Sequence, residues 1–395
     1  MRHARARIGH VILRVWPLAV AVALLVAAPV LISFNRHGRV AVAATLYLPD
    51  MVLQLPLPFR TVDLISDPPT RERITIDYQS RNGPRSIEAD LYLPAHGARH
   101  EGVVFSMGAP PLSLDDKRLV RVAEDASRSG VVMLVPFSDR LDDIRIEPEE
   151  IDALVAEFQY VQALPQVDPA RVGFFGASVG GSLALVAAAD PRIADAVDHV
   201  VSFGGYFDAL DTFGAIATHH IAYGDVDEAW VPRDHAERVM AHQLIDRVDD
   251  PRDRQLLTSW FIDDEPPGPE QYATLSPVGR TSYDFLANRD PNAVRQLIDR
   301  LPPDAIADLE YLSPRTSVSR VKAELFIIHD RGDQFIPYTE SRRLQDALRG
   351  RPRSHFDELR LFQHVEPKLN QRPEIIALDS TRLLFRLYQL LLRWD

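Results

Sequence analysis

Apolar residues along most of the chain fall into two kinds of pattern. Short, continuous apolar runs predict strands buried on both faces, and apolar residues three and four positions apart predict amphipathic helices. The predicted strands cover residues 73–78, 86–93, 102–106, 131–136, 171–175, 197–203, 324–329 and 358–362. The predicted helices cover residues 115–129, 147–164, 179–189, 338–348 and 375–393. This alternation predicts an α/β fold with a mostly parallel sheet that carries helices on both faces.

One stretch, at about residues 206–312, breaks the alternation. It is polar and rich in proline and acidic residues, with helical spacing at 236–247, 253–261 and 292–301. It is too long for a simple loop. We therefore expect a single globular domain over residues 72–395 that carries a helical insertion at the C-terminal edge of the sheet.

The N-terminus has a different pattern, because residues 15–35 form a run of 21 uncharged residues between Arg14 and Arg36. As a helix this run would measure about 31 Å, enough to cross a bilayer. More arginines precede the run than follow it, which favours a cytoplasmic N-terminus. Residues 1–39 are thus predicted to be an uncleaved signal anchor with one transmembrane helix, which places the globular part outside the cytoplasm, in the periplasm or extracellular space. The alternative is a secreted protein, cleaved near Ala41, Val42 and Ala43.

Residues 40–71 are predicted to be a membrane-proximal segment. Residues 40–59 are again apolar, and Asp50 is their only charged residue. Pro49, Pro56 and Pro58 argue against a second straight membrane helix. We expect the segment to lie on the globular domain, with contact to the lipid surface as the alternative.

Charge and composition narrow the function classes. The net charge is −12, and residues 1–39 hold six arginines and no acidic residue, so the remaining 38 basic and 56 acidic residues make the body strongly acidic. An acidic body argues against nucleic-acid binding. The chain has no cysteine, which excludes disulfides, thiolate metal sites and a cysteine nucleophile. Serine then becomes the leading candidate for covalent catalysis.

A G-x-S-x-G motif runs from Gly176 to Gly180, with Ser178 at its centre. It follows a predicted strand and opens a predicted helix, the context in which this motif forms a sharp turn that exposes the serine hydroxyl. Ser178 is therefore the candidate nucleophile. The amide of Val179, at the start of the helix, is the first candidate donor to an oxyanion.

The second oxyanion donor in this architecture comes from the loop after the third strand. That loop reads S-M-G-A-P-P at residues 106–111. Because proline has no N–H, the donor is Met107, Gly108 or Ala109, and Ala109 or Met107 is preferred.

A serine nucleophile needs a histidine base and an acid that orients it, in the chain order serine, acid, histidine. Asp333 lies in the loop after the predicted strand 324–329 and is the preferred acid. Asp330, nearer the strand end, is its rival and is interpreted as a turn or capping residue. His364 follows the last predicted strand and is the candidate base. His355 precedes that strand and is expected at the opposite edge of the sheet.

These residues resemble the α/β-hydrolase superfamily, in particular its dienelactone-hydrolase-like and prolyl-oligopeptidase-like branches. The similarity rests on I-E-A-D-L-Y-L-P at 87–94, V-D-P-A-R-V-G at 167–173 leading into G-A-S-V-G-G, H-D-R-G-D-Q-F-I-P at 329–337, and His364. It covers about residues 72–204 and 322–393.

The resemblance implies an eight-stranded, mostly parallel sheet, a triad of Ser178, His364 and Asp333, and no cofactor. It also implies that residues 206–312 are a cap over the active site. The chain departs from the family in two places: S-M-G-A-P-P stands where many members have a His-Gly pair, and Gln363 stands where a small residue is common.

The sequence therefore predicts a membrane-anchored serine hydrolase of the carboxylesterase or lipase-like kind, acting on small-molecule or lipid esters through an acyl-enzyme on Ser178. A serine peptidase or a thioesterase on the same triad is one alternative. A non-catalytic binding protein with the same fold is another.

Two further classes of site are not expected. A stretch rich in histidine and aspartate holds His219, His220, Asp225, Asp227 and His235, but it lacks the H-E-x-x-H pattern and is explained by a polar cap surface. No metal site is therefore predicted. G-A-S-V-G-G lacks the lysine of a phosphate-binding loop, so nucleotide hydrolysis is excluded.

Overall fold

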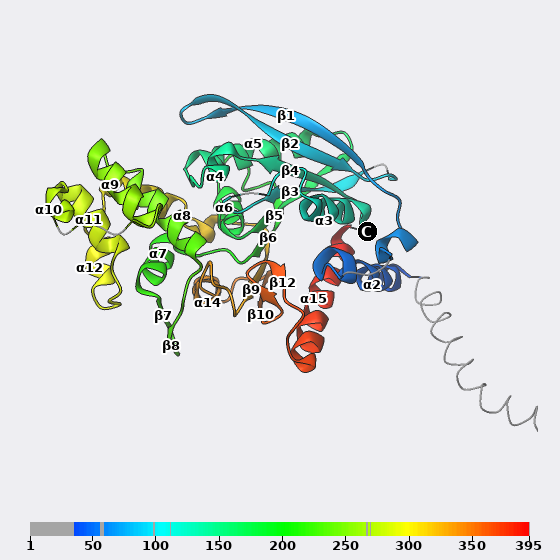
Figure 1. Ribbon diagram of the computed structural model, residues 1–395. Coiled ribbons are helices and arrows are strands. Elements are labelled where there is room, and N and C mark those ends of the chain that lie inside the picture. Colours follow the sequence, from blue (N-terminus) through cyan, green and yellow to red (C-terminus); the bar gives the residue numbers. More distant parts are fainter. Residues whose placement is uncertain are drawn as a thin grey trace, which may run out of the picture.

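An eight-stranded sheet forms the centre of the computed structural model in Figure 1, which describes residues 35–55, 59–97, 99–110, 112–265, 268 and 270–394. The strand order is β1-β2-β4-β3-β5-β6-β9-β10. Strand β2 is antiparallel to β1 and to β4, and the other neighbours are parallel. The strands are β1 (Thr70–Ser80), β2 (Gly83–Leu93), β3 (His100–Ser106), β4 (Val131–Phe137), β5 (Val167–Ala177), β6 (Val197–Phe203), β9 (Glu324–Asp330) and β10 (Ser354–Leu359). The predicted α/β fold with a mostly parallel sheet is confirmed.

Helices cover both faces of the sheet. Successive side chains of a strand point to opposite faces of the sheet, so both faces of an inner strand such as β6 are apolar. Val200 belongs to the core beneath α5 and α6, whereas Val201 belongs to the core beneath α15 and α2. Helix α3 covers the second face beside α15, over β4. The helices of the two faces are α5 (Glu149–Ala163), α6 (Val179–Ala187) and α14 (Thr339–Ala347) on the first, and α2 (Arg36–Tyr47), α3 (Lys117–Arg128) and α15 (Pro373–Trp394) on the second.

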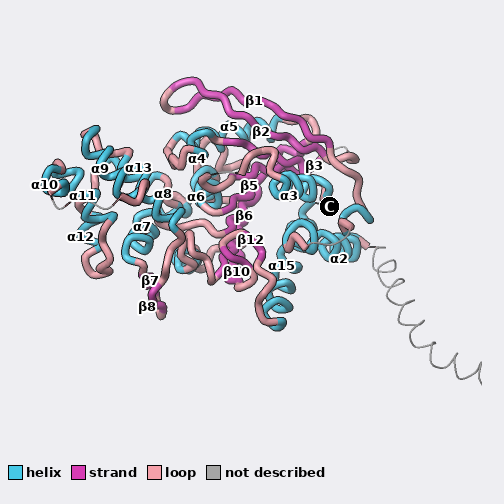
Figure 2. The backbone as a smooth tube through the Cα atoms, viewed as in Figure 1, coloured by secondary structure: helices cyan, strands magenta, loops and turns pink. Residues whose placement is uncertain are grey.

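The insertion leaves the sheet after β6 and returns to it at β9, and Figure 2 shows it as a mostly helical body beside the sheet. Its members are α7 (Ala209–Thr218), β7 (His220–Tyr223), β8 (Val226–Ala229), α8 (Asp234–Ile245), α9 (Pro251–Phe261), α10 (Gln271–Thr274), α11 (Pro277–Leu286), α12 (Val294–Ile298) and α13 (Pro303–Tyr311). We call this body the cap. Short helical turns complete the chain: η1 (Leu48–Val52), η2 (Thr61–Leu64), α4 (Asp139–Asp142), η3 (Pro314–Thr316) and η4 (Val318–Arg320).

The two ends of the cap are tied together at their base. The Glu340 carboxylate of α14 accepts the backbone N–H groups of Phe207 and Asp208 at 3.1 and 2.8 Å. Asp208 pairs with Arg315 at 2.5 Å, and the backbone N–H of Arg315 donates to the Phe207 carbonyl at 3.0 Å. The start and the return of the insertion are therefore held at one place, beside the sheet.

The described part of the chain begins with α2, which the side chain of Asn35 caps by accepting the N–H of Gly38 at 2.8 Å. The helix packs against α15, so Arg36 to Arg39, which were assigned to the anchor, lie in a helix on the globular domain. Residues 15–34 of the predicted transmembrane run lie outside the described residues. Among the helices that the structure does describe, none has both the length and the apolar character needed to cross a bilayer.

The last predicted strand, at 358–362, is misplaced. Strand β10 covers Ser354–Leu359, and Phe362–Gln363 instead forms a small ribbon, β11, with β12 (Glu366–Pro367). Strand β10 is an edge strand whose first five positions are only half-buried, so it lacks the apolar run that marks the inner strands. The chain turns away after it, because the Arg360 N–H donates to Asp379 of α15 at 2.7 Å.

Candidate active site

Ser178 occupies a strained turn between β5 and α6. Its backbone has φ 57° and ψ −134°, a conformation that residues other than glycine rarely adopt. The turn is held by the Ser178 N–H, which donates to the Phe203 carbonyl of the neighbouring strand at 2.8 Å. This is the geometry in which a serine at the carboxyl end of a strand presents its hydroxyl above the sheet.

Glycines make the turn possible because backbone segments approach closely around it. A Cβ at Gly180 would lie 2.1 Å from the Ser106 carbonyl oxygen, and one at Gly176 would lie 2.4 Å from the Gly180 carbonyl oxygen. Gly108 brings the loop after β3 against the serine, since a Cβ there would lie 2.9 Å from Ser178 Cβ. The flanking glycines of the motif are thus required by these close contacts.

His364 and Asp333 meet at the same end of the sheet. His364 Nδ1 lies 2.6 Å from Asp333 Oδ2, and both side chains are buried. Because a carboxylate only accepts, Nδ1 carries the hydrogen, and Nε2 is left able to take a proton. Gly204, the residue after Phe203, lies against both groups: a Cβ there would be 3.3 Å from His364 Nδ1 and 3.4 Å from Asp333 Oδ2.

Asp333 is surrounded by donors. Its Oδ1 accepts the backbone N–H groups of Phe335 and Ile336 at 2.7 and 3.0 Å, and its Oδ2 faces His364 and His329. Burial raises the pKa of Asp333, but the two histidines outweigh it and hold the pKa well below its ordinary value. The carboxylate therefore stays ionised at physiological pH and can orient His364.

His329 is a site residue that the sequence reasoning missed. Its Nε2 lies 3.3 Å from Asp333 Oδ2 and 3.1 Å from the Ile336 carbonyl oxygen, so an Nε2–H faces the same carboxylate oxygen as His364. Burial lowers the pKa of His329, but its interactions with Asp333, the Ile336 carbonyl and Asp330 together raise the pKa by more. The only sequence signal is a histidine at the end of an otherwise apolar strand, directly before the acid loop.

Asp330, the rival acid, shapes the loop instead. It accepts the backbone N–H groups of Gly332 at 2.7 Å and Phe362 at 2.8 Å. Burial raises its pKa to about 6. His355 lies in β10, where it pairs with Glu324 at 2.8 Å at the start of β9, at the opposite edge of the sheet as expected.

The candidate oxyanion residues fall into two groups. Ala109, Ser178 and Val179 line one cavity, whereas the buried Met107 belongs to the core beneath α3. Val179 opens α6, where backbone N–H groups have no acceptor within the helix. The structure thus brings Val179 and Ala109 to the serine and directs the Met107 side chain elsewhere.

The cavity beside Ser178 has a volume of about 50 Å³ and is roofed by α7, α8 and α13 of the cap. Side chains of the cap also hydrogen-bond to the two loops that flank the site, the loop after β9 and the loop after β3. Trp230 Nε1–H donates to the Asp333 carbonyl at 2.7 Å, and His235 Nε2 lies 2.8 Å from the Ala109 carbonyl oxygen. Phe335 lines the cavity and stacks on the His364 ring at 4.7 Å. The cap therefore lines the cavity and also forms hydrogen bonds to the loops that carry Asp333 and Ala109.

The histidine- and aspartate-rich stretch of the cap does not converge. His219 pairs with Glu237 at 2.8 Å, and His220 pairs with Asp227 at 2.9 Å. His235 faces the loop after β3, as described above. His219 and His220 thus make separate pairs within the cap, and His235 lines the cavity beside Ser178.

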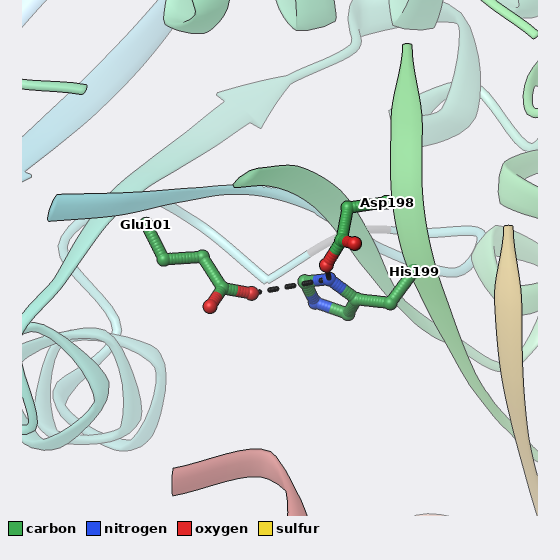
Figure 3. A group of neighbouring side chains, drawn as sticks. All are labelled: Glu101, Asp198 and His199. Carbon is green, nitrogen blue, oxygen red and sulfur yellow. Dashed lines mark hydrogen bonds and ion pairs between the residues drawn. The ribbon is translucent and has the colours of Figure 1, made fainter. Parts of the chain in front are cut away.

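Another group in the described residues, outside that stretch, brings possible metal ligands together. Figure 3 shows the carboxylates of Glu101 and Asp198 pointing toward His199, with Nδ1 at 3.1 Å from Glu101 Oε1 and 3.3 Å from Asp198 Oδ2. Two guanidinium groups already face these acids, since Arg393 pairs with Asp198, and Arg171 lies 3.7 Å from Glu101. The positive charge that a cation would bring is thus supplied by arginine. The group lies at the amino ends of β3 and β6, the opposite edge from Ser178, and fastens α15 to the sheet.

A family model described as acetyl xylan esterase matches residues 151–228. That span runs from α5 through the Ser178 turn to β8 of the cap. It does not reach Asp333 or His364.

Two curated relatives match part of the chain. A Mycobacterium tuberculosis protein, provisionally named a phosphoribosyl transferase, is 30% identical over 175 residues, which is 39% of this chain and 35% of that protein. The protein named hydrolase acrC, from Aspergillus aculeatus, is 31% identical over 151 residues, 33% of this chain and 35% of its own. The chain thus spans about a third of the length of the curated relatives that it matches, and their names do not transfer to it.

A solved structure from Legionella pneumophila, provisionally named a hydrolase, superposes over nearly the whole chain. It covers 91% of this chain and 94% of that one, with a TM-score of 0.55 and 14% sequence identity. At that identity the likeness shows a shared fold.

Proposed function

We propose that the chain is a serine hydrolase of the α/β-hydrolase superfamily, and that it cleaves carboxylic esters through an acyl-enzyme on Ser178. One observation carries the proposal. The strained Ser178 turn and the hydrogen-bonded pair of His364 and Asp333 lie at the same edge of the sheet. Nucleophile, base and orienting acid are the three groups that acyl transfer by serine requires.

Each residue has one role in the proposed reaction. Ser178 Oγ attacks the ester carbonyl carbon while His364 Nε2 takes the hydroxyl proton. The tetrahedral intermediate collapses, the bond to the leaving oxygen breaks, and His364 returns the proton to the departing alcohol. Water then attacks the acyl-enzyme with the same base, releasing the carboxylic acid and restoring the Ser178 hydroxyl. Asp333 stays ionised throughout, fixes the imidazole tautomer and stabilises its cation.

The negative charge on the carbonyl oxygen needs two donors. We assign these to the backbone N–H groups of Val179 and Ala109, because both residues line the cavity with Ser178. The alternative to Ala109 as the second donor is the backbone N–H of Met107, whose side chain packs in the core beneath α3.

Esters are the proposed substrates because the family model over the Ser178 region is described as an acetyl xylan esterase. The proposal includes small-molecule and lipid esters, and no cofactor enters it.

We also propose that residues preceding α2 anchor the protein in a membrane, with the hydrolase domain outside the cytoplasm. The support is the uncharged run 15–35, the six arginines of residues 1–39 and the acidic body that follows.

Replacing the nucleophile tests the proposed reaction. Ser178→Ala should lower kcat/KM for p-nitrophenyl butanoate by at least about 10³-fold, because the oxyanion donors remain but covalent catalysis is lost. Ser86→Ala, on an exposed position of β2, is the matched control and should keep the wild-type rate. Equal rates for Ser178→Ala and the wild type would contradict the proposal. Hydrolysis of peptide amides in place of esters would favour the peptidase alternative.

A further inference from the structure

The loop after β3, which carries the second proposed oxyanion donor, has few hydrogen bonds of its own. Among the described residues, the backbone N–H groups of Met107, Gly108 and Ala109 have no acceptor, and Pro110 has no N–H. Uncommitted N–H groups beside Ser178 are what an oxyanion site needs, because they can donate to a ligand. The same lack of backbone hydrogen bonds means that something else must hold these N–H groups in place.

A histidine of the cap supplies one hydrogen bond to this loop. His235 Nε2 lies 2.8 Å from the Ala109 carbonyl oxygen. Because a carbonyl only accepts, Nε2 carries the hydrogen. Within the part of the chain that the structure describes, this is the one hydrogen bond in which Gly108 and Ala109 take part. His235 also lines the cavity beside Ser178, so the bond is made at the site itself.

The cap segment 230–235, which ends at His235, is fastened to the loop of the acid. Trp230 Nε1–H donates to the Asp333 carbonyl at 2.7 Å, and the Arg233 N–H donates to the Gln334 carbonyl at 2.8 Å. The side chain of Gln334 in turn accepts the side-chain amide of Gln363 at 3.2 Å. The segment therefore bridges the loop after β9 and the loop after β3.

The His235 ring is restrained by a second contact. It lies 6.3 Å from the Phe335 ring between centroids, and Phe335 stacks on the His364 ring at 4.7 Å. With Nε2 on Ala109 and the ring beside Phe335, the imidazole has a fixed place between the two loops. A donor held in this way can fix the position of a loop that has no other hydrogen bond.

We propose that His235 is a positioning residue of the active site, and that its bond to the Ala109 carbonyl aims a backbone N–H of the loop after β3 at the oxyanion. The inference rests on the proposed esterase function and adds a residue of the cap on which stabilisation of the transition state depends. The carbonyl and the N–H of Ala109 flank one Cα, so movement of the carbonyl also turns the N–H. A misplacement of about 1 Å can cost about 10²-fold in rate.

Replacing His235 tests the proposal. His235→Leu removes the donor and should lower kcat for p-nitrophenyl butanoate about 10- to 100-fold with KM nearly unchanged, because the lost interaction acts in the transition state. His235→Gln keeps an N–H and should recover part of the loss. His242→Leu makes the same substitution at a half-buried position of α8 that does not line the cavity, and should keep the wild-type kcat.

A trifluoromethyl ketone inhibitor separates positioning from folding. Ser178 Oγ bonds to the ketone carbon, its proton passes to His364, and the ketone oxygen becomes an alkoxide in the place of the oxyanion. The Ki of the ketone should therefore rise in His235→Leu by the same factor as kcat/KM falls. A smaller amount of folded protein would lower the apparent kcat but would leave Ki unchanged.

Three results would overturn the role of His235 while the esterase function stands. They are a wild-type kcat in folded His235→Leu, a lowered kcat with an unchanged Ki, and a raised KM with an unchanged kcat. Folded wild-type protein that hydrolyses no ester would overturn the proposed function itself.

Discussion

At the scale of single residues, the orientation of Asp333 is the feature on which the proposed chemistry depends. Four donors surround its carboxylate: two backbone N–H groups on Oδ1, and His364 and His329 on Oδ2. A carboxylate fixed by four donors cannot rotate away from His364 without breaking several bonds at once. His329 is therefore a positioning residue, acting on His364 through Asp333.

Replacing His329 should slow the reaction without weakening substrate binding. His329→Leu removes a donor to Oδ2, so we expect kcat to fall about 10- to 100-fold with KM nearly unchanged, because the base is misplaced. His329→Gln keeps an N–H and should recover part of the loss. His355→Gln, at the opposite edge of the sheet, is the control and should not change kcat. A wild-type kcat in folded His329→Leu would show that the second histidine is not needed.

At the scale of elements, α5 is unusual because it carries buried acidic residues into the core. Glu150 pairs with Arg140 at 2.9 Å, and Asp152 pairs with Arg81 and Arg192 at 3.0 and 2.8 Å. Glu157 differs, since its Oε2 is buried with no hydrogen-bond partner among the described residues. Burial, with the like charge of Glu150, raises the pKa of Glu157 to about 8.

The raised pKa makes stability depend on pH. Between pH 4.5 and 8 the folded chain keeps a proton on Glu157 that the unfolded chain loses, so the free energy of unfolding falls as pH rises. Glu157→Gln removes this contribution, up to about 1.4 kcal/mol per pH unit. Relative to the wild type, the variant should therefore gain stability from pH 5.5 to 7.5 in urea unfolding.

The control for that measurement is Glu88→Gln, at an exposed position of β2. Its free energy of unfolding should change between pH 5.5 and 7.5 by the same amount as that of the wild type. If Glu157→Gln and Glu88→Gln respond to pH alike, Glu157 does not keep its proton in the folded protein.

At the scale of the whole molecule, α2 and the cap lie on different sides of the sheet, as Figure 1 shows. Helix α2 is fastened to α15 by Arg36, which donates to the Leu392 carbonyl at 2.6 Å, and by His37, which lies 2.7 Å from the Tyr388 hydroxyl. The helix makes these contacts far from the Ser178 cavity. Removal of the proposed membrane anchor should therefore leave the proposed catalytic site intact.

Truncation tests that separation. The full chain should sediment with membranes and resist carbonate extraction, because the arginine-flanked apolar run precedes α2. A chain that begins at Asn35 keeps the residue whose side chain accepts the backbone N–H of Gly38 in the first turn of α2. It should appear in the soluble fraction with the kcat of the full chain. Full-length protein that stays in the soluble fraction would contradict the anchor.

The sequence predicts a feature of the structure well when the residues that determine it are close together in the chain. The sequence predicts Ser178 because its motif, strand and helix are contiguous, and it predicts Asp333 and His364 because each follows a strand near the end of the chain. The last strand was misplaced because an edge strand has no continuous apolar run. The bond from Trp230 to Asp333 joins residues 103 positions apart, and no local pattern encodes it.

The nucleophile is the central claim, and covalent labelling tests it most directly. A fluorophosphonate probe incubated with the full-length protein, followed by peptide mapping, should modify Ser178, since an activated serine attacks phosphorus as it attacks a carbonyl. Labelling should slow strongly in His364→Ala and disappear in Ser178→Ala. Folded wild-type protein that takes up no probe, or that takes it up at another serine, would contradict the account.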